Sequence, residues 1–185
     1  MHSITFQPLH RLSPAELLEF SHLNRDFQCE MNANGSISLR TAPRARFATA
    51  TSALKIALEK WLDDDSASVV ESRIGFVLRN GAVRHPSLAW VRAFKMAAQT
   101  EHLIERVPDF FLEFLTASES LALVRTRMNE YIANGARLGW LVDLDNEMVY
   151  IFQENAEEKV VENFHQRLTG GDILRGFSFD LAAWK

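Results

Sequence analysis

The sequence is poor in the residues that build covalently linked or metal-stabilised scaffolds. It has one cysteine, Cys29, in 185 residues, which excludes an internal disulfide framework and a cysteine-based zinc site. Its six histidines are scattered without the spacing of metal ligands. The HExxH, GxGxxG, GxSxG and P-loop motifs are also missing. These absences argue against zinc proteases, dinucleotide-binding enzymes, α/β-hydrolases and P-loop NTPases.

Long hydrophobic runs are missing as well. The apolar runs stay far below the roughly 18 residues of a membrane span, and no long apolar stretch follows His2 and His10 near the N-terminus. We therefore expect neither a membrane helix nor a signal peptide, and a cytoplasmic location. With 47% hydrophobic and 24% charged residues, the composition is that of a globular protein. Residues 1–185 are expected to form a single domain.

An excess of positive charge is also lacking, since the formal net charge is −4. This balance argues against a chain that coats nucleic acid non-specifically, although a local basic surface stays possible. Two groups of basic residues stand out. The first contains Arg40, Arg44 and Arg46, and the second contains Arg84, Arg92 and Lys95. We interpret both groups as solvated surface charges.

Hydrophobic periodicity and turn signals predict an α+β or α/β chain, in which helices pack around a mixed sheet. The expected helices are residues 14–22, 46–61, 94–106 and 121–133. The expected strands are residues 27–31, 36–40, 68–78, 83–91, 110–115, 138–143 and 148–152, followed by a short strand-like stretch near the C-terminus. Ser13 and Glu16 form a capping signal for the first helix. Pro86 favours an edge or a bend in its strand.

One carboxylate interrupts the most apolar of these strands. Glu113 lies among Phe111, Leu112, Phe114 and Leu115. A buried carboxylate is costly unless a metal, a cation or hydrogen bonds receive it. Glu113 is therefore either a metal ligand or a structural residue paired with an arginine.

The stretch 107–143 resembles the core of the Uma-type restriction endonucleases, a branch of the PD-(D/E)XK nuclease superfamily. Three blocks carry this resemblance: Pro108 to Glu113 on a strand, Arg127 to Tyr131 on a helix, and Asn134 to Asp143, which reads NGARLGWLVD. The resemblance implies a restriction-endonuclease-like mixed sheet flanked by helices. It also implies Mg²⁺-dependent cleavage of DNA. A homodimer is expected separately, because exposed hairpin edges invite pairing between copies of the chain.

The resemblance assigns four positions to the catalytic set, and two of them are substituted. Glu30 and Glu113 match the carboxylates that hold the metal, whereas Ser87 stands where an Asp is expected and Arg127 where a Lys is expected. A hydroxyl is a weak ligand for Mg²⁺. Arginine is always protonated and cannot act as a base. The implied activity is therefore weak or absent, and Mg²⁺ is implied only for an active enzyme.

Neighbouring residues offer little compensation for these substitutions. Asp109 lies roughly 13 Å from Glu113 along an extended strand, which is too far for one metal ion. The imidazole of His85 suits transition metals better than Mg²⁺. No sequence pattern places Glu71 near these residues. The alternative function is a non-catalytic homodimer of the same fold that binds DNA or a protein. Cys29 and the aromatic residues are expected in the core, and the latter include Trp90, Trp140, Tyr150 and Trp184.

Overall fold

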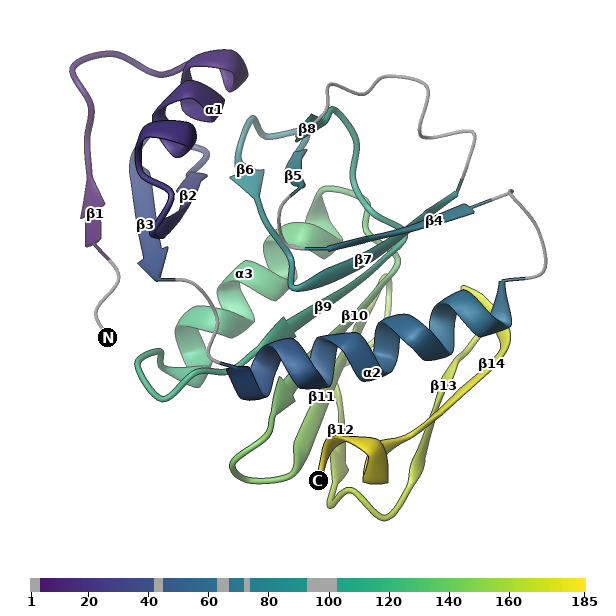
Figure 1. The fold of residues 1–185 in the computed structure, drawn as a ribbon. Coiled ribbons are helices and arrows are strands. Elements are labelled where there is room, and N and C mark those ends of the chain that lie inside the picture. Colours follow the sequence, from purple (N-terminus) through teal and green to yellow (C-terminus); the bar gives the residue numbers. More distant parts are fainter. Residues whose placement is uncertain (1–3, 42–44, 63–66, 72–73, 93–102) are drawn as a thin grey trace.

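In the computed structural model, residues 4–41, 45–62, 67–71, 74–92 and 103–185 are described, and two six-stranded sheets organise them (Figure 1). The first sheet has the order β1 (Ile4–Phe6), β3 (Ile37–Thr41), β2 (Phe27–Met31), β6 (Val83–Arg84), β5 (Gly75–Val77), β8 (Leu103–Ile104). The second sheet has the order β12 (Lys159–Glu162), β11 (Met148–Gln153), β10 (Leu138–Asp143), β9 (Phe110–Phe114), β7 (Leu88–Arg92), β4 (Ala67–Glu71). The α+β class is therefore confirmed.

The second sheet is covered on both faces, and the pleat of β9 determines which side chains point to each face. Phe110 and Leu112 face α2 (Ala45–Trp61) and the hairpin of β13 (Arg167–Gly170) and β14 (Leu174–Asp180). Phe111 belongs to the opposite core cluster, under α3 (Leu121–Ala133). Alternation along the strand then directs Glu113 to the same face as Phe111.

Helix α3 connects the parallel strands β9 and β10 and lies close to the sheet. Gly139 on β10 makes this approach possible, because a Cβ there would lie 2.7 Å from Cε1 of Phe111 and 3.0 Å from Cε of Met128. The helix begins at the cap Ser120, whose hydroxyl accepts a hydrogen bond from the Leu123 amide. The NGARLGWLVD block thus supplies a small residue where the Phe111 ring and the end of the Met128 side chain pack.

The first sheet carries the N-terminal part of the chain. Helix α1 (Pro14–Leu23) starts with the predicted capping box of Ser13 and Glu16. Its Leu17 is buried in a small core cluster with Cys29 and Ile37. The β2–β3 hairpin turns at Gly35, whose φ of 84° favours glycine.

Two strands that the sequence predicts as continuous are each divided between the sheets. The predicted strand 68–78 becomes β4 and β5, and the predicted strand 83–91 becomes β6 and β7, with the buried Pro86 between them. Proline lacks the N–H that a central strand needs, so the chain leaves the first sheet there and enters the second. The alternation of hydrophobic residues cannot reveal that the chain changes sheets, because the same alternating pattern continues on both sides of the break.

The prediction of a helix at 94–106 is wrong at its end, where Leu103 and Ile104 form β8. Residues 94–102 lie outside the described residues. The strands β12, β13 and β14 are more extensive than the single short stretch predicted near the C-terminus. The core prediction is confirmed, because Cys29, Trp90, Trp140 and Trp184 are all buried. No helix in the described ranges combines the length and apolar character needed to cross a membrane.

Candidate functional site

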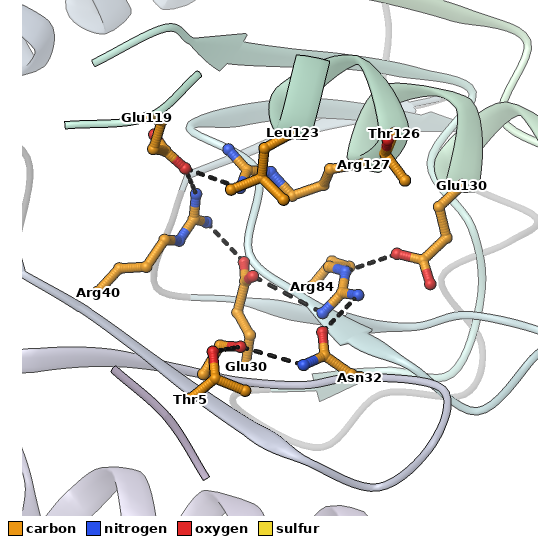
Figure 2. A pocket seen from close by; sticks show the side chains of 11 residues that line it. Thr5, Glu30, Asn32, Arg40, Arg84, Glu119, Leu123, Thr126, Arg127 and Glu130 are labelled. Carbon is orange, nitrogen blue, oxygen red and sulfur yellow. Dashed lines mark hydrogen bonds and ion pairs between the residues drawn. The ribbon is translucent and has the colours of Figure 1, made fainter. Parts of the chain in front are cut away.

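A pocket of about 300 Å³ lies where the first sheet meets the outer face of α3 (Figure 2). Its walls come from β1, β2, β3, β6, the turn before α3, and α3 itself. The lining residues are Thr5, Glu30, Asn32, Ser38, Arg40, Arg84, Glu119, Leu123, Thr126, Arg127 and Glu130. Charged side chains of both signs therefore alternate around the pocket.

Glu30 on β2 is 2% exposed and lies at the centre of this network. Its Oε1 accepts hydrogen bonds from Nη2 of Arg40 at 2.6 Å and from the backbone N–H of His85 at 3.0 Å. Nη1 of Arg84 lies 3.8 Å from its Oε2. Burial alone would raise the pKa of Glu30, but the guanidinium groups of Arg40 and Arg84 outweigh burial and lower it to about 2.

Glu113 on β9 lies deeper and is also 2% exposed. Its Oε2 is 3.7 Å from Nη2 of Arg127 and 3.9 Å from Nη1 of Arg40. Its Oε1 has no hydrogen-bond partner among the described residues. Burial therefore raises the pKa of Glu113, because the attraction of Arg127 and Arg40 offsets the cost of desolvation only in part.

Arg127 and Arg40 share a third carboxylate, that of Glu119 in the turn before α3. Nη1 of Arg127 donates a hydrogen bond of 2.9 Å to Oε1 of Glu119, and Nη1 of Arg40 lies 3.8 Å from the same oxygen. Burial opposes the charged form of both arginines, yet Glu113 and Glu30 raise the pKa of each above its usual value. Both guanidinium groups are therefore permanently charged.

Arg84 differs from these two arginines because each of its terminal groups is bonded. Its Nε donates to Glu130 at 2.7 Å, its Nη1 to the carbonyl of Met31 at 3.1 Å, and its Nη2 to Oδ1 of Asn32 at 2.9 Å. It connects β6 to β2 and to α3. We conclude that Arg84 forms part of the pocket wall.

The sequence-derived candidates are brought to one region. Glu30 and Arg127 line the pocket, and Glu113 contacts Arg127 behind it. Ser87 is half-buried just before β7 and donates its backbone N–H to the carbonyl of Leu112 at 2.9 Å. The next residue, Leu88, is paired with Leu112, so Ser87 lies at the end of this ladder, beside the pair that contains the residue preceding Glu113.

The residues at this site do not fit a divalent cation. Glu30 and Glu113 each have guanidinium groups within 4 Å, and these positive charges oppose a dication. Asp109 is buried and paired with Arg92, so it does not complete the set. Across the part of the chain that the structure describes, no group of three His, Cys, Asp or Glu residues could hold a metal ion.

The sequence interpretation of the basic residues needs a correction. Arg40 and Arg84 are largely buried in the pocket and are not solvated surface charges. Arg44 and Lys95 lie outside the described residues. The register of the β2–β3 hairpin shows why Arg40 reaches Glu30. Glu30 is paired with Ser38, and Arg40 lies two residues after Ser38, so both Arg40 and Glu30 point to the same face of the sheet.

Opposite pKa shifts at the two buried carboxylates predict opposite effects of pH on stability. The pKa of Glu30 is lowered, so its ionised form stabilises the fold. This contribution to the free energy of unfolding is fully present above pH 4.5 and is lost as the pH falls towards 2. The pKa of Glu113 is raised, so its protonated form is favoured in the fold. This contribution to the free energy of unfolding is present below pH 4.5 and is lost as the pH rises through the pKa of the folded state. At pH 7 we expect Glu30→Gln to destabilise the fold by on the order of 3 kcal/mol and Glu113→Gln to stabilise it. Urea unfolding of the two variants from pH 3 to 8 tests this, and equal signs at pH 7 would contradict it.

Comparisons with known proteins agree with this architecture. Residues 14–182 match the model of the Uma2 family, described as "Putative restriction endonuclease". The structure is similar to the crystal structure of a putative nuclease belonging to DUF820 from Anabaena variabilis ATCC 29413. That similarity has a TM-score of 0.74 at 14% sequence identity, and it covers 84% of this chain and 88% of the other. Among curated proteins there is no match.

Proposed function

Because the chain belongs to the Uma2 family of putative restriction endonucleases, we propose that it is a nuclease-fold protein with a degraded catalytic set. Its cleavage of DNA is then weak or absent, and it acts without Mg²⁺. One observation carries this proposal: guanidinium groups lie 2.6 Å from Glu30 and 3.7 Å from Glu113, the two carboxylates that the family resemblance assigns to the metal.

The chemistry of the remaining groups supports weak or absent hydrolysis. A bound metal lowers the pKa of an attacking water and polarises the phosphate. Arg127 can stabilise negative charge on a phosphate oxygen, but it cannot accept a proton from water. Glu30 holds its negative charge against Arg40 and Arg84. Arg127 and Glu30 therefore supply electrostatic stabilisation, but neither of them activates water.

Calorimetric titration with Mg²⁺ and Mn²⁺, together with plasmid cleavage on the same samples, tests this proposal. We expect wild-type protein to bind neither ion at millimolar concentration and to leave the plasmid intact. Glu113→Ala serves as the matched variant. If wild-type protein binds metal and cuts DNA, and Glu113→Ala abolishes both, the degraded-site proposal is wrong.

The alternative function is a non-catalytic homodimer that binds DNA or a protein. The edge strand β1 favours self-association, because it presents Ile4 at 55% and Phe6 at 37% exposure and has no charged residue. The edge strand β12 of the second sheet instead carries Lys159 and Glu162, which protect an edge from pairing. Sedimentation velocity in EDTA, with and without duplex DNA, discriminates here: a monomer that leaves DNA unshifted contradicts this alternative.

A further inference from the structure

Residues 4–41 form an N-terminal unit of β1, α1, β2 and β3 that packs around a small core cluster (Figure 1). That cluster comprises Leu17, Cys29, Met31 and Ile37 of the unit, together with Val83 of β6 and Leu103 of β8. In the ranges that the structure describes, no residue of 4–41 belongs to either of the two larger apolar clusters, which include the residues of β9, β10 and α3. Apolar burial therefore does not hold this unit against α3.

The N-terminal unit is attached instead along β6 and the residue that follows it. Strand β2 pairs with β6 at one position, where Met31 is the partner of Val83. Two side-chain hydrogen bonds strengthen this line: Nη1 of Arg84 donates to the carbonyl of Met31 at 3.1 Å, and Nε2 of Gln28 donates to the carbonyl of His85 at 2.8 Å. Because these contacts follow one short strand, they define an axis about which the unit can turn.

The pocket separates the same unit from α3. Arg40 reaches across it, and its Nη1 lies 3.8 Å from Oε1 of Glu119 and 3.9 Å from Oε2 of Glu113 (Figure 2). Both distances exceed that of a hydrogen bond. Leu123 lies on the α3 wall of the pocket and is 54% exposed, so the hairpin does not cover it. The contacts towards α3 are therefore weaker than those along β6.

Each side of the pocket also keeps its own counter-charges when the two sides separate. Within the unit, Arg40 retains its hydrogen bond of 2.6 Å to Glu30. On the other side, Arg127 retains Glu119 at 2.9 Å and Glu113 at 3.7 Å. Breaking a buried ion pair is costly mainly because one charge is left without a partner. Moving Arg40 away from Glu119 and Glu113 leaves none of these groups in that state.

We propose that the N-terminal unit is a lid, which pivots on β6 and separates from α3 so that the pocket opens. In the closed form the pocket has a volume of about 300 Å³, and Oε1 of Glu113 and Nη2 of Arg127 are buried. The open form exposes these two residues to molecules that the closed pocket does not admit. The inference goes beyond the proposed function, because it holds whether or not the site binds a metal ion.

Distances between pairs of spin labels, measured by double electron–electron resonance, test the lid. Glu19→Cys on α1 and Asn129→Cys on α3 place labels at exposed positions of the unit and of the rest of the chain, and Cys29→Ala removes the native thiol. We expect two distances for this pair, one for each form. Glu59→Cys on α2 with Asn129→Cys is the reference pair, because both positions lie outside the unit, and it should give one distance.

A charge-neutral substitution in the turn before α3 should shift the balance between the two forms. Glu119→Gln removes a carboxylate to which Arg40 reaches across the pocket, so we expect the open fraction to rise at least about 3-fold. Glu158→Gln is the matched control. It makes the same change but breaks the surface pair with Arg125, away from the pocket, so the open fraction should stay at the wild-type value. Circular dichroism checks that both variants are folded.

The outcomes separate the lid from the proposed function. A single distance between the labels at positions 19 and 129, or an open fraction that Glu119→Gln does not raise, would overturn the lid. An equal change in the reference pair would also overturn it, because it would indicate that the whole fold loosens. Failure of the lid leaves the proposed function in place, since that proposal rests on the contacts of Glu30 and Glu113 and is tested by metal binding and cleavage.

Discussion

Arg40→Ala is expected to lower the free energy of unfolding at pH 7 by about 3–5 kcal/mol, the usual cost of breaking a buried ion pair. Arg40 approaches three carboxylates, those of Glu30, Glu113 and Glu119. Its removal leaves Glu30 buried without its shortest contact and places the negative charges in each other's field. Urea-induced unfolding followed by circular dichroism measures this loss.

Two further variants identify the cause of the loss. Arg46→Ala removes an arginine whose side chain is 54% exposed and paired with Asp145, so we expect a change within about 1 kcal/mol. Adding Glu30→Gln to Arg40→Ala removes the uncompensated charge and should recover part of the stability. If Arg40→Ala is no more damaging than Arg46→Ala, Arg40 does not hold the network together.

Ser87→Asp combined with Arg127→Lys is expected to restore divalent-metal binding, with an affinity for Mn²⁺ at least 100-fold above that of wild-type protein. Ser87 donates its backbone N–H to the carbonyl of Leu112, the neighbour of Glu113, so an Asp at position 87 would bring a second carboxylate close to Glu113. The Lys also removes the guanidinium fork next to Glu113. Each restored group contributes about 10²–10⁴-fold to a rate, so plasmid cleavage should become detectable.

The control for this double variant is a third substitution, Glu113→Gln, which should abolish metal binding because it removes one of the two carboxylates. Titration with Mn²⁺ and cleavage assays on all three proteins make the comparison. A double variant that binds no metal would contradict this prediction, and would indicate that Arg40 and Arg84, which remain beside Glu30, are enough to keep cations out of the site.

The central unit of the fold could be predicted from sequence because its signals are local. Strand β10 and helix α3 have the predicted bounds, and the stop at Asn134 and Gly135 is where the sequence indicates it. The passage of the chain from one sheet to the other at Pro86 could not be predicted, because local sequence patterns do not show which strands pair with each other. The β13–β14 hairpin escaped prediction because Gly170 and Gly176 interrupt the strand pattern of its sequence.

Only those residues of the candidate site to which the family resemblance assigns a position could be predicted from the sequence. The structure brings Glu30, Glu113 and Arg127 together as the resemblance implies. The partners Arg40 and Arg84 could not be found from composition, because an arginine that neutralises a buried carboxylate is indistinguishable in sequence from one in water. Only the register of the β2–β3 hairpin and the packing of α3 decide between the two.

The pocket joins segments that are synthesised far apart in time. Glu30 and Arg40 belong to the N-terminal hairpin, whereas Glu113, Glu119 and Arg127 come about 80 residues later. At roughly 5–20 residues per second, the ribosome needs roughly 4–16 s to supply the second group. During that interval the nascent chain already contains Glu30 and Arg40 but lacks α3. Protease sensitivity of ribosome-bound chains should therefore fall sharply once α3 has emerged.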